Sequence, residues 1–139
     1  MVVVVQHTTI INRSGGSVNV RPLSSDYSKL EAVPVVDSVV AYYCPHTLEK
    51  LIIVVRSGLY VHSMMNNFIP PFVIREAGLI VNCVPKINIE RQKLTNNSHC
   101  IVSTVDGNVT DLRIPMQLDG ILSYFLTQNL TQEEINKCE

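Results

Sequence analysis

The chain has 139 residues, 46% of them hydrophobic, and a formal net charge of −1. This length is typical of one domain, and the hydrophobic content is too high for a disordered chain. Lysine and arginine residues are scattered, and no apolar run approaches the ~20 residues that span a bilayer. The sequence therefore predicts neither a nucleic-acid partner nor a membrane partner.

Valine and isoleucine supply much of the apolar content, which favours strands over helices. Eight segments have the alternating or β-branched pattern of strands: residues 2–11, 18–23, 33–43, 51–61, 79–84, 99–105, 109–115 and 121–126. Turn residues predict a turn at 12–16 and hairpins at 44–50 and 106–108. Pro22 predicts that the second strand lies at an edge or ends early, and Gly58 predicts a bulge in the fourth strand.

One internal helix is predicted between the fourth and fifth strands. Pro70 and Pro71 set backbone angles that suit a helix start, where a missing N–H costs nothing. The spacing places Phe72, Val73 and Ala77 on one helical face. Gly78 follows, and glycine takes the left-handed conformation that ends many helices. We therefore expect a short helix that stops at Gly78.

The element pattern predicts an all-β fold, a small closed or partly open barrel with this one short helix inside the chain. We expect one β domain over residues 1–126 and a C-terminal tail over residues 127–139. In the tail, Thr131 and Glu134 have the spacing of a capping box, which predicts one or two helical turns over residues 131–137.

An aspartic protease requires two carboxylates that share a proton, each on a tight turn whose third residue is small. Asp37–Val39 has a branched third residue and resembles the interior of a strand. Asp106–Asn108 and Asp119–Ile121 lack the hydroxyl residue and are better hairpin turns. Arg13–Gly16 has the Ser-Gly pair but carries arginine in place of the acid. We therefore predict no catalytic aspartate among these segments.

Other nucleophile and metal schemes are also poorly supported. Cys44 and His46 are close in a predicted turn but lack a third orienting group. His99 and Cys100 are expected to point to opposite faces of a strand, which makes them a poor metal pair. Met64–Met65 is expected to fill gaps in the core.

The remaining chemistry-bearing residues form only a loose set without zinc-site spacing: His7, His46, His62, His99 and Cys83. A metal-dependent enzyme stays a third hypothesis that rests on this set alone. We predict no catalytic, metal or cofactor site. The N-terminus lacks the pattern of a secretory signal, so we expect a cytoplasmic, intracellular protein with free thiols at Cys44, Cys83, Cys100 and Cys138.

Several segments in one order carry a resemblance to a known family. The stretch LYV at 59–61, NFIPPF at 67–72 and IREAG at 74–78 resembles the end of the protease-like segment in Copia-type retrotransposon polyproteins. Other segments are similar to the same family: SVNV at 17–20, VPVVDSVVAY at 33–42, VPKI at 84–87 and LRIPMQLDGILSYF at 112–125. The resemblance covers most of the chain.

The resemblance implies a retropepsin-like β fold of the aspartic endopeptidase class. The family's catalytic motif, Asp-Ser/Thr-Gly or Asp-Ser-His-Ala-Asp, would lie before residue 1 in this register. We therefore expect an aspartic-protease-like polyprotein region, N-terminally incomplete, that has no peptidase activity alone. The alternative is a binding module that forms a homodimer or pairs with a polyprotein segment through an exposed edge strand.

Overall fold

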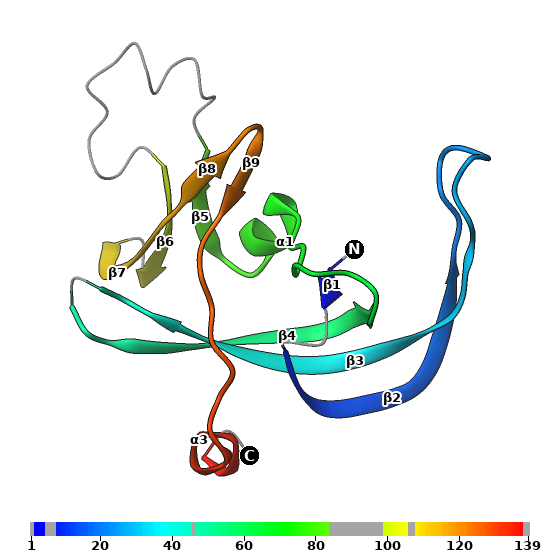
Figure 1. The fold of residues 1–139 in the computed structure, drawn as a ribbon. Helices are drawn as coiled ribbons and strands as arrows, with labels where there is room; N and C mark the ends of the chain where they lie inside the picture. Colours follow the sequence, from blue (N-terminus) through cyan, green and yellow to red (C-terminus); the bar gives the residue numbers. More distant parts are fainter. Residues whose placement is uncertain (1, 5–7, 46, 84–98, 106–107, 138–139) are drawn as a thin grey trace. The chain divides into compact units, whose positions relative to one another are not determined.

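The computed structural model describes residues 2–4, 8–45, 47–83, 99–105 and 108–137. Strands dominate these residues, helices are few and short, and the sheets do not close on themselves (Figure 1). The predicted all-β fold is therefore confirmed, in its partly open form. The chain forms two compact units: unit 1 is Met1–Ile69 with Thr127–Glu139, and unit 2 is Pro70–Leu126. Nothing in the sequence pattern indicated this division.

Unit 1 is built on a four-stranded sheet with the order β1-β4-β3-β2. Its strands are β1 (Val3–Val4), β2 (Thr9–Val20), β3 (Leu30–Tyr43) and β4 (Lys50–Tyr60). β1 runs parallel to β4, and the other neighbours are antiparallel. β2 is an edge strand that ends before Pro22, as the proline predicted.

The predicted turn at residues 12–16 is wrong, because β2 continues through it. Residues 14–16 of β2 lie opposite the single residue Val35 of β3, so the glycine-rich segment forms a bulge with two extra residues. Gly15 takes a φ of 74°, and the Ser14 hydroxyl donates to the Val35 carbonyl at 3.1 Å. Pairing with β3 on both sides of the bulge thus outweighs the local turn preference.

The bulge predicted at Gly58 lies one step earlier in β4. Arg56 and Ser57 together oppose Asp37 of β3, and Ser57 takes a φ of 54°. Gly58 itself resumes the pairing, opposite Val36. The extra residue therefore precedes the glycine, and the absence of a side chain at Gly58 leaves room for Val4 of β1.

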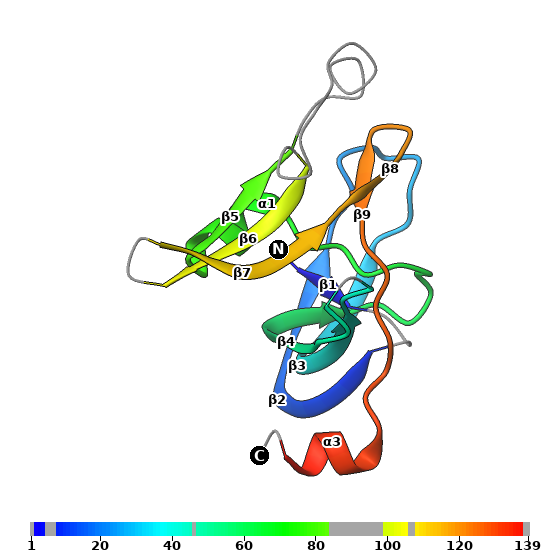
Figure 2. The same ribbon diagram turned by 90° about the vertical axis from the view of Figure 1, so that its left-hand side faces the viewer.

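Residues 127–137, which we call the strap, return to unit 1 after the whole of unit 2. The predicted helical turn is present as α3 (Gln132–Asn136), in red in Figures 1 and 2. The N–H of Thr131 donates to the Glu134 carboxylate at 2.8 Å, as a capping box requires. The strap also contacts the sheet, because Leu130 forms a buried cluster with Val39 and Ala41 of β3, and Ile135 packs against that cluster.

Among its described residues, unit 2 holds the predicted internal helix and five strands: α1 (Pro71–Glu76), β5 (Leu79–Asn82), β6 (Cys100–Val105), β7 (Asn108–Pro115), β8 (Gln117–Asp119) and β9 (Leu122–Tyr124). Strands β5, β6 and β7 form one antiparallel sheet. The paired residues Val81, Ile101 and Ile114 are buried on one face of that sheet. Neither α1 nor α3 of the described residues has the length and apolar character needed to cross a membrane.

Two hairpins of unit 2 compare differently with the sequence prediction. The strands β6 and β7 pair up to Val105 and Asn108, so the predicted hairpin is present, although its turn residues Asp106 and Gly107 lie outside the described residues. The strand predicted at 121–126 is present in a shorter form as β9, Leu122–Tyr124. It pairs with β8, which was not predicted as a strand, and Gly120 turns this hairpin with a φ of 61°.

Helix α1 begins after Pro70 and is followed by Gly78 with a φ of 86°, as predicted. The predicted apolar face is wrong in detail, since Phe72 is 54% exposed and the partly buried residues are Val73 and Ile74. A helix this short does not bury a continuous apolar face. The residues at its two ends determine where it begins and stops.

Gly78→Val should lower the free energy of unfolding by about 1–2 kcal/mol, because a left-handed backbone strains a branched residue. A Cβ at this position would meet no atom within 4 Å, so the effect isolates backbone strain from packing. Gly78→Asn is the matched control, since asparagine tolerates this conformation. Urea denaturation followed by circular dichroism measures both. Equal losses for the two variants would contradict the assigned role of Gly78.

Candidate functional site

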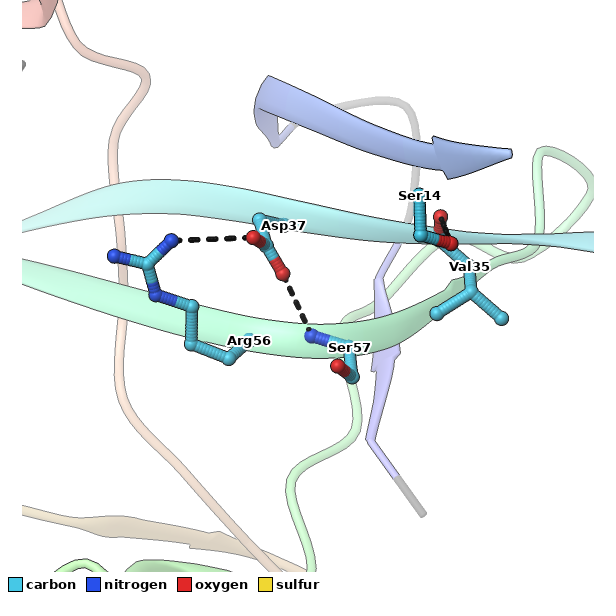
Figure 3. A network of polar contacts seen from close by, with 5 residues as sticks. All are labelled: Ser14, Val35, Asp37, Arg56 and Ser57. Carbon is cyan, nitrogen blue, oxygen red and sulfur yellow. Dashed lines mark hydrogen bonds and ion pairs between the residues drawn. The ribbon is translucent and has the colours of Figure 1, made fainter. Parts of the chain in front are cut away.

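Asp37 is the predicted candidate that the structure places in a defined polar network, shown in Figure 3. It lies inside β3, as its strand-like sequence predicted, and faces the bulge of β4. A bulge displaces a backbone N–H from the regular ladder and leaves it in need of an acceptor. One Asp37 oxygen accepts the Ser57 N–H at 2.8 Å, and the other accepts Arg56 Nη1 at 3.1 Å.

These two contacts hold the Asp37 carboxylate in its charged form. The hydrogen bond from the Ser57 N–H, followed by that from Arg56, lowers the pKa of Asp37 below its ordinary value. Because the folded pKa is the lower one, the carboxylate stabilises the fold above its unfolded pKa of about 4. That contribution disappears as the pH falls through the folded pKa.

Asp37 thus has the surroundings of a structural hydrogen-bond acceptor. A general base works best when its pKa is near the working pH, and an aspartic-protease dyad needs a second carboxylate at hydrogen-bond distance. The polar partners of Asp37 in the described chain are instead a guanidinium, a backbone N–H and the side chain of Asn12. The Arg56 side chain is 72% exposed, so solvent and salt screen the ion pair between Arg56 and Asp37.

The other segments considered for a protease turn contain Asp119, Asp106 and Arg13. Asp119 ends β8 beside Gly120 and opposite Leu122, which confirms the hairpin turn that the sequence predicted. Asp106 lies outside the described residues. Arg13 is at the edge of the β2 bulge, and its guanidinium stands 5.9 Å from the centre of the Tyr60 ring. In the described residues of unit 1, the side-chain partners of Asp37 are Arg56 and Asn12, and neither is a carboxylate.

Of the two cysteine–histidine pairs, only His99 with Cys100 lies wholly within the described residues, and it is not part of a metal-binding group there. Cys44 is buried at the β3–β4 hairpin, where its N–H donates to the Glu49 carbonyl at 2.9 Å. Its predicted neighbour His46 lies outside the described residues. Cys100 is fully buried in β6, and burial lowers the pKa of His99 next to it. The environment of Cys100 is that of a core residue.

Of the looser metal set, only His62, His99 and Cys83 lie within the described residues. His62 and Cys83 are exposed, and His7 lies outside the described residues. Met64 packs against the core cluster of Val3 and its neighbours, but Met65 is 82% exposed, so the core role predicted for both is wrong for Met65. In the part of the chain that the structure describes, no three His, Cys, Asp or Glu side chains are grouped to hold a metal ion.

Sequence reasoning missed the partners of Asp37, although the sequence carries a signal for them. The triplet Arg-Ser-Gly occurs twice, at 13–15 and 56–58. Each copy lies at a bulge in a strand that flanks β3, and the bulges oppose Val35 and Asp37. The small and flexible residues of the triplet suit a bulge, and serine supplies polar groups that satisfy the disturbed ladder.

The described cysteines Cys44, Cys83 and Cys100 are not joined in disulfides, and Cys138 lies outside the described residues. Comparison of the chain with protein-family models, with curated proteins and with solved structures found no match.

Proposed function

We propose that this chain is an aspartic-protease-like β domain of a Copia-type retrotransposon polyprotein that does not hydrolyse peptides on its own. The observation that carries the catalytic part of this proposal is the state of Asp37. Both of its oxygens are engaged by β4, and its polar partners in the described chain include no second carboxylate with which to share a proton.

The family part of the proposal is supported by the ordered segments that resemble Copia polyproteins, including the LYV strand end and the short helix that stops at Gly78. The unbridged state of Cys44, Cys83 and Cys100 is typical of a reducing compartment and supports a cytoplasmic location. No cofactor is part of this proposal.

A peptidase assay tests the proposal. We expect the purified, folded chain to leave a fluorogenic peptide library intact between pH 3 and pH 7, at every protein concentration tested. Asp37→Asn should behave identically, because Asp37 supplies no proton to a reaction. Cleavage that pepstatin blocks and that Asp37→Asn abolishes would overturn the proposal.

A second candidate function is an interaction module that pairs through an exposed edge strand. The observation that favours it is the contrast between the two edges of the unit 1 sheet. β1 is short and buried, and Val3 exchanges two 2.9 Å backbone hydrogen bonds with Phe68. β2 is 12 residues long and mostly exposed. Long exposed edges recruit other strands, although bulges such as that at residues 14–16 restrict regular pairing.

Light scattering over a concentration series tests this second function. Self-pairing through β2 should double the apparent mass as the concentration rises. A mass that stays at one chain throughout would exclude a homodimer through this edge.

A further inference from the structure

The strap occupies the edge of β3 at a place where the described pairing with β2 has ended. The last described pair of β2 and β3 joins Thr9 to Val39. Two residues further along β3, Ala41 exchanges both backbone hydrogen bonds with Gln128: its N–H donates at 2.8 Å and its carbonyl accepts at 2.7 Å. The strap is thus added to the sheet by one antiparallel residue pair, as a bound peptide is in strand addition.

One apolar side chain anchors the strap beside this backbone pair. Leu130 is 7% exposed and packs on Val39 and Ala41, which are both fully buried. Ile11 of β2 and Ile135 of α3 border the same cluster. Burial of a leucine side chain is a large apolar contribution for so short a segment. By contrast, Leu126, just ahead of the strap, is 73% exposed.

A charged contact fixes the far end of the strap. The Glu134 carboxylate is paired with the Lys50 ammonium at the start of β4, and its second oxygen accepts the Thr131 N–H at 2.8 Å. The Lys50 contact, followed by that of Thr131, lowers the pKa of Glu134 to about 2. The strap therefore presents three features in order: a backbone pair at Gln128, an apolar anchor at Leu130 and an acid at Glu134.

The strap is held by these contacts rather than by structure of its own. Its only helix, α3, has five residues and none of them is buried. Helices of this length are not stable alone in water. Segments with few buried contacts are the parts of a protein that open most readily. The β3 edge is thus a strand-addition surface whose present occupant is weakly self-supporting.

We propose that this surface, formed by Ile11, Val39, Ala41 and Lys50, is a binding site for a short segment of another protein that is extended where it pairs with Ala41 and helical after its apolar anchor, and that the strap is its internal competitor. The partner segment has the strap's chemistry: an apolar side chain in the place of Leu130 and a carboxylate four residues later. This inference rests on the second proposed function, that of an interaction module, and assigns its site to the β3 edge rather than to β2.

A labelled peptide with the sequence of residues 127–137 probes the site by fluorescence anisotropy against the full chain. The internal strap competes at an effective concentration of about millimolar, so the wild-type chain should bind the peptide weakly. Leu130→Ala in the full chain weakens the competitor, and we expect it to tighten peptide binding by about tenfold or more. Adding Lys50→Gln to that chain should reverse part of the gain, because it removes the partner of Glu134.

The controls separate site-specific binding from other effects. A peptide that carries Leu130→Ala should bind neither chain, and Glu134→Gln in the full chain is a milder way to weaken the strap should Leu130→Ala unfold it. Equal peptide affinity of the wild-type and strap-weakened chains, with the strand spectrum retained, would overturn the proposal. A strap-weakened chain that dimerises without binding peptide would also overturn it, in favour of strap exchange between copies.

The same measurements distinguish this inference from the function on which it rests. A chain that stays monomeric in light scattering but binds the peptide keeps the β3 site and excludes self-pairing through β2. A chain that self-associates but shows no strap-dependent peptide binding keeps the interaction module and excludes this site.

Discussion

Val39→Ala should lower the free energy of unfolding by about 2–3 kcal/mol, since it removes two buried methyl groups and leaves a cavity. Val39 is fully buried where β3 meets the strap, and it packs with Ala41 and Leu130. The substitution should therefore weaken both the packing within β3 and the contact between β3 and the strap. Urea denaturation followed by circular dichroism measures the loss.

Val54→Ala is the matched control for this prediction. Val54 lies directly opposite Val39 in the β3–β4 ladder but is 46% exposed. The same chemical change should therefore cost less than about 1 kcal/mol there. A similar loss at both positions would mean that the strap does not bury Val39 in the way the structure describes.

Gly58→Val should destabilise the chain by about 2–3 kcal/mol through overpacking. A Cβ built at Gly58 would lie 3.3 Å from Cγ1 of Val4 and 3.3 Å from Cγ1 of Val55. Val4 is 1% exposed and belongs to the short edge strand β1, so it has little room to move. A branched side chain adds two more atoms to this contact and should displace β1 from β4.

A graded series checks that contact rather than backbone strain is responsible. Gly58→Ala adds only the Cβ and should cost about 1 kcal/mol, well below the cost of valine. Thermal denaturation of the three proteins gives the order directly. If alanine and valine destabilised equally, or not at all, the close approach of Val4 to β4 would be refuted.

Local signals in the sequence predicted the elements whose ends are determined by a few neighbouring residues. The two prolines and Gly78 delimit α1 correctly, and Thr131 with Glu134 predicts α3. The strand-like surroundings of Asp37 also placed it correctly inside β3. These successes share a physical basis, because caps and backbone angles act over one helical turn.

Distant partners explain what the sequence pattern did not predict. Residues 12–16 have turn chemistry, yet β3 pairs on both sides of them and keeps β2 continuous. The engagement of Asp37 depends on Ser57, 20 residues away in sequence. The strap rejoins unit 1 through the backbone pair of Ala41 and Gln128. Pairings across such separations leave no local signature in a single sequence.

The proposal that Asp37 is held ionised and shares no proton is tested most directly by a carbon-detected NMR titration of the aspartate carboxyl groups in the full chain. Asp37 should titrate in a single step below its ordinary pKa of about 3.9, and Arg56→Gln should raise that pKa. A proton shared with a second carboxylate would instead appear as two coupled steps. Coupled steps, or a pKa of Asp37 near or above about 5, would contradict the proposal that this carboxylate is held ionised and is not catalytic.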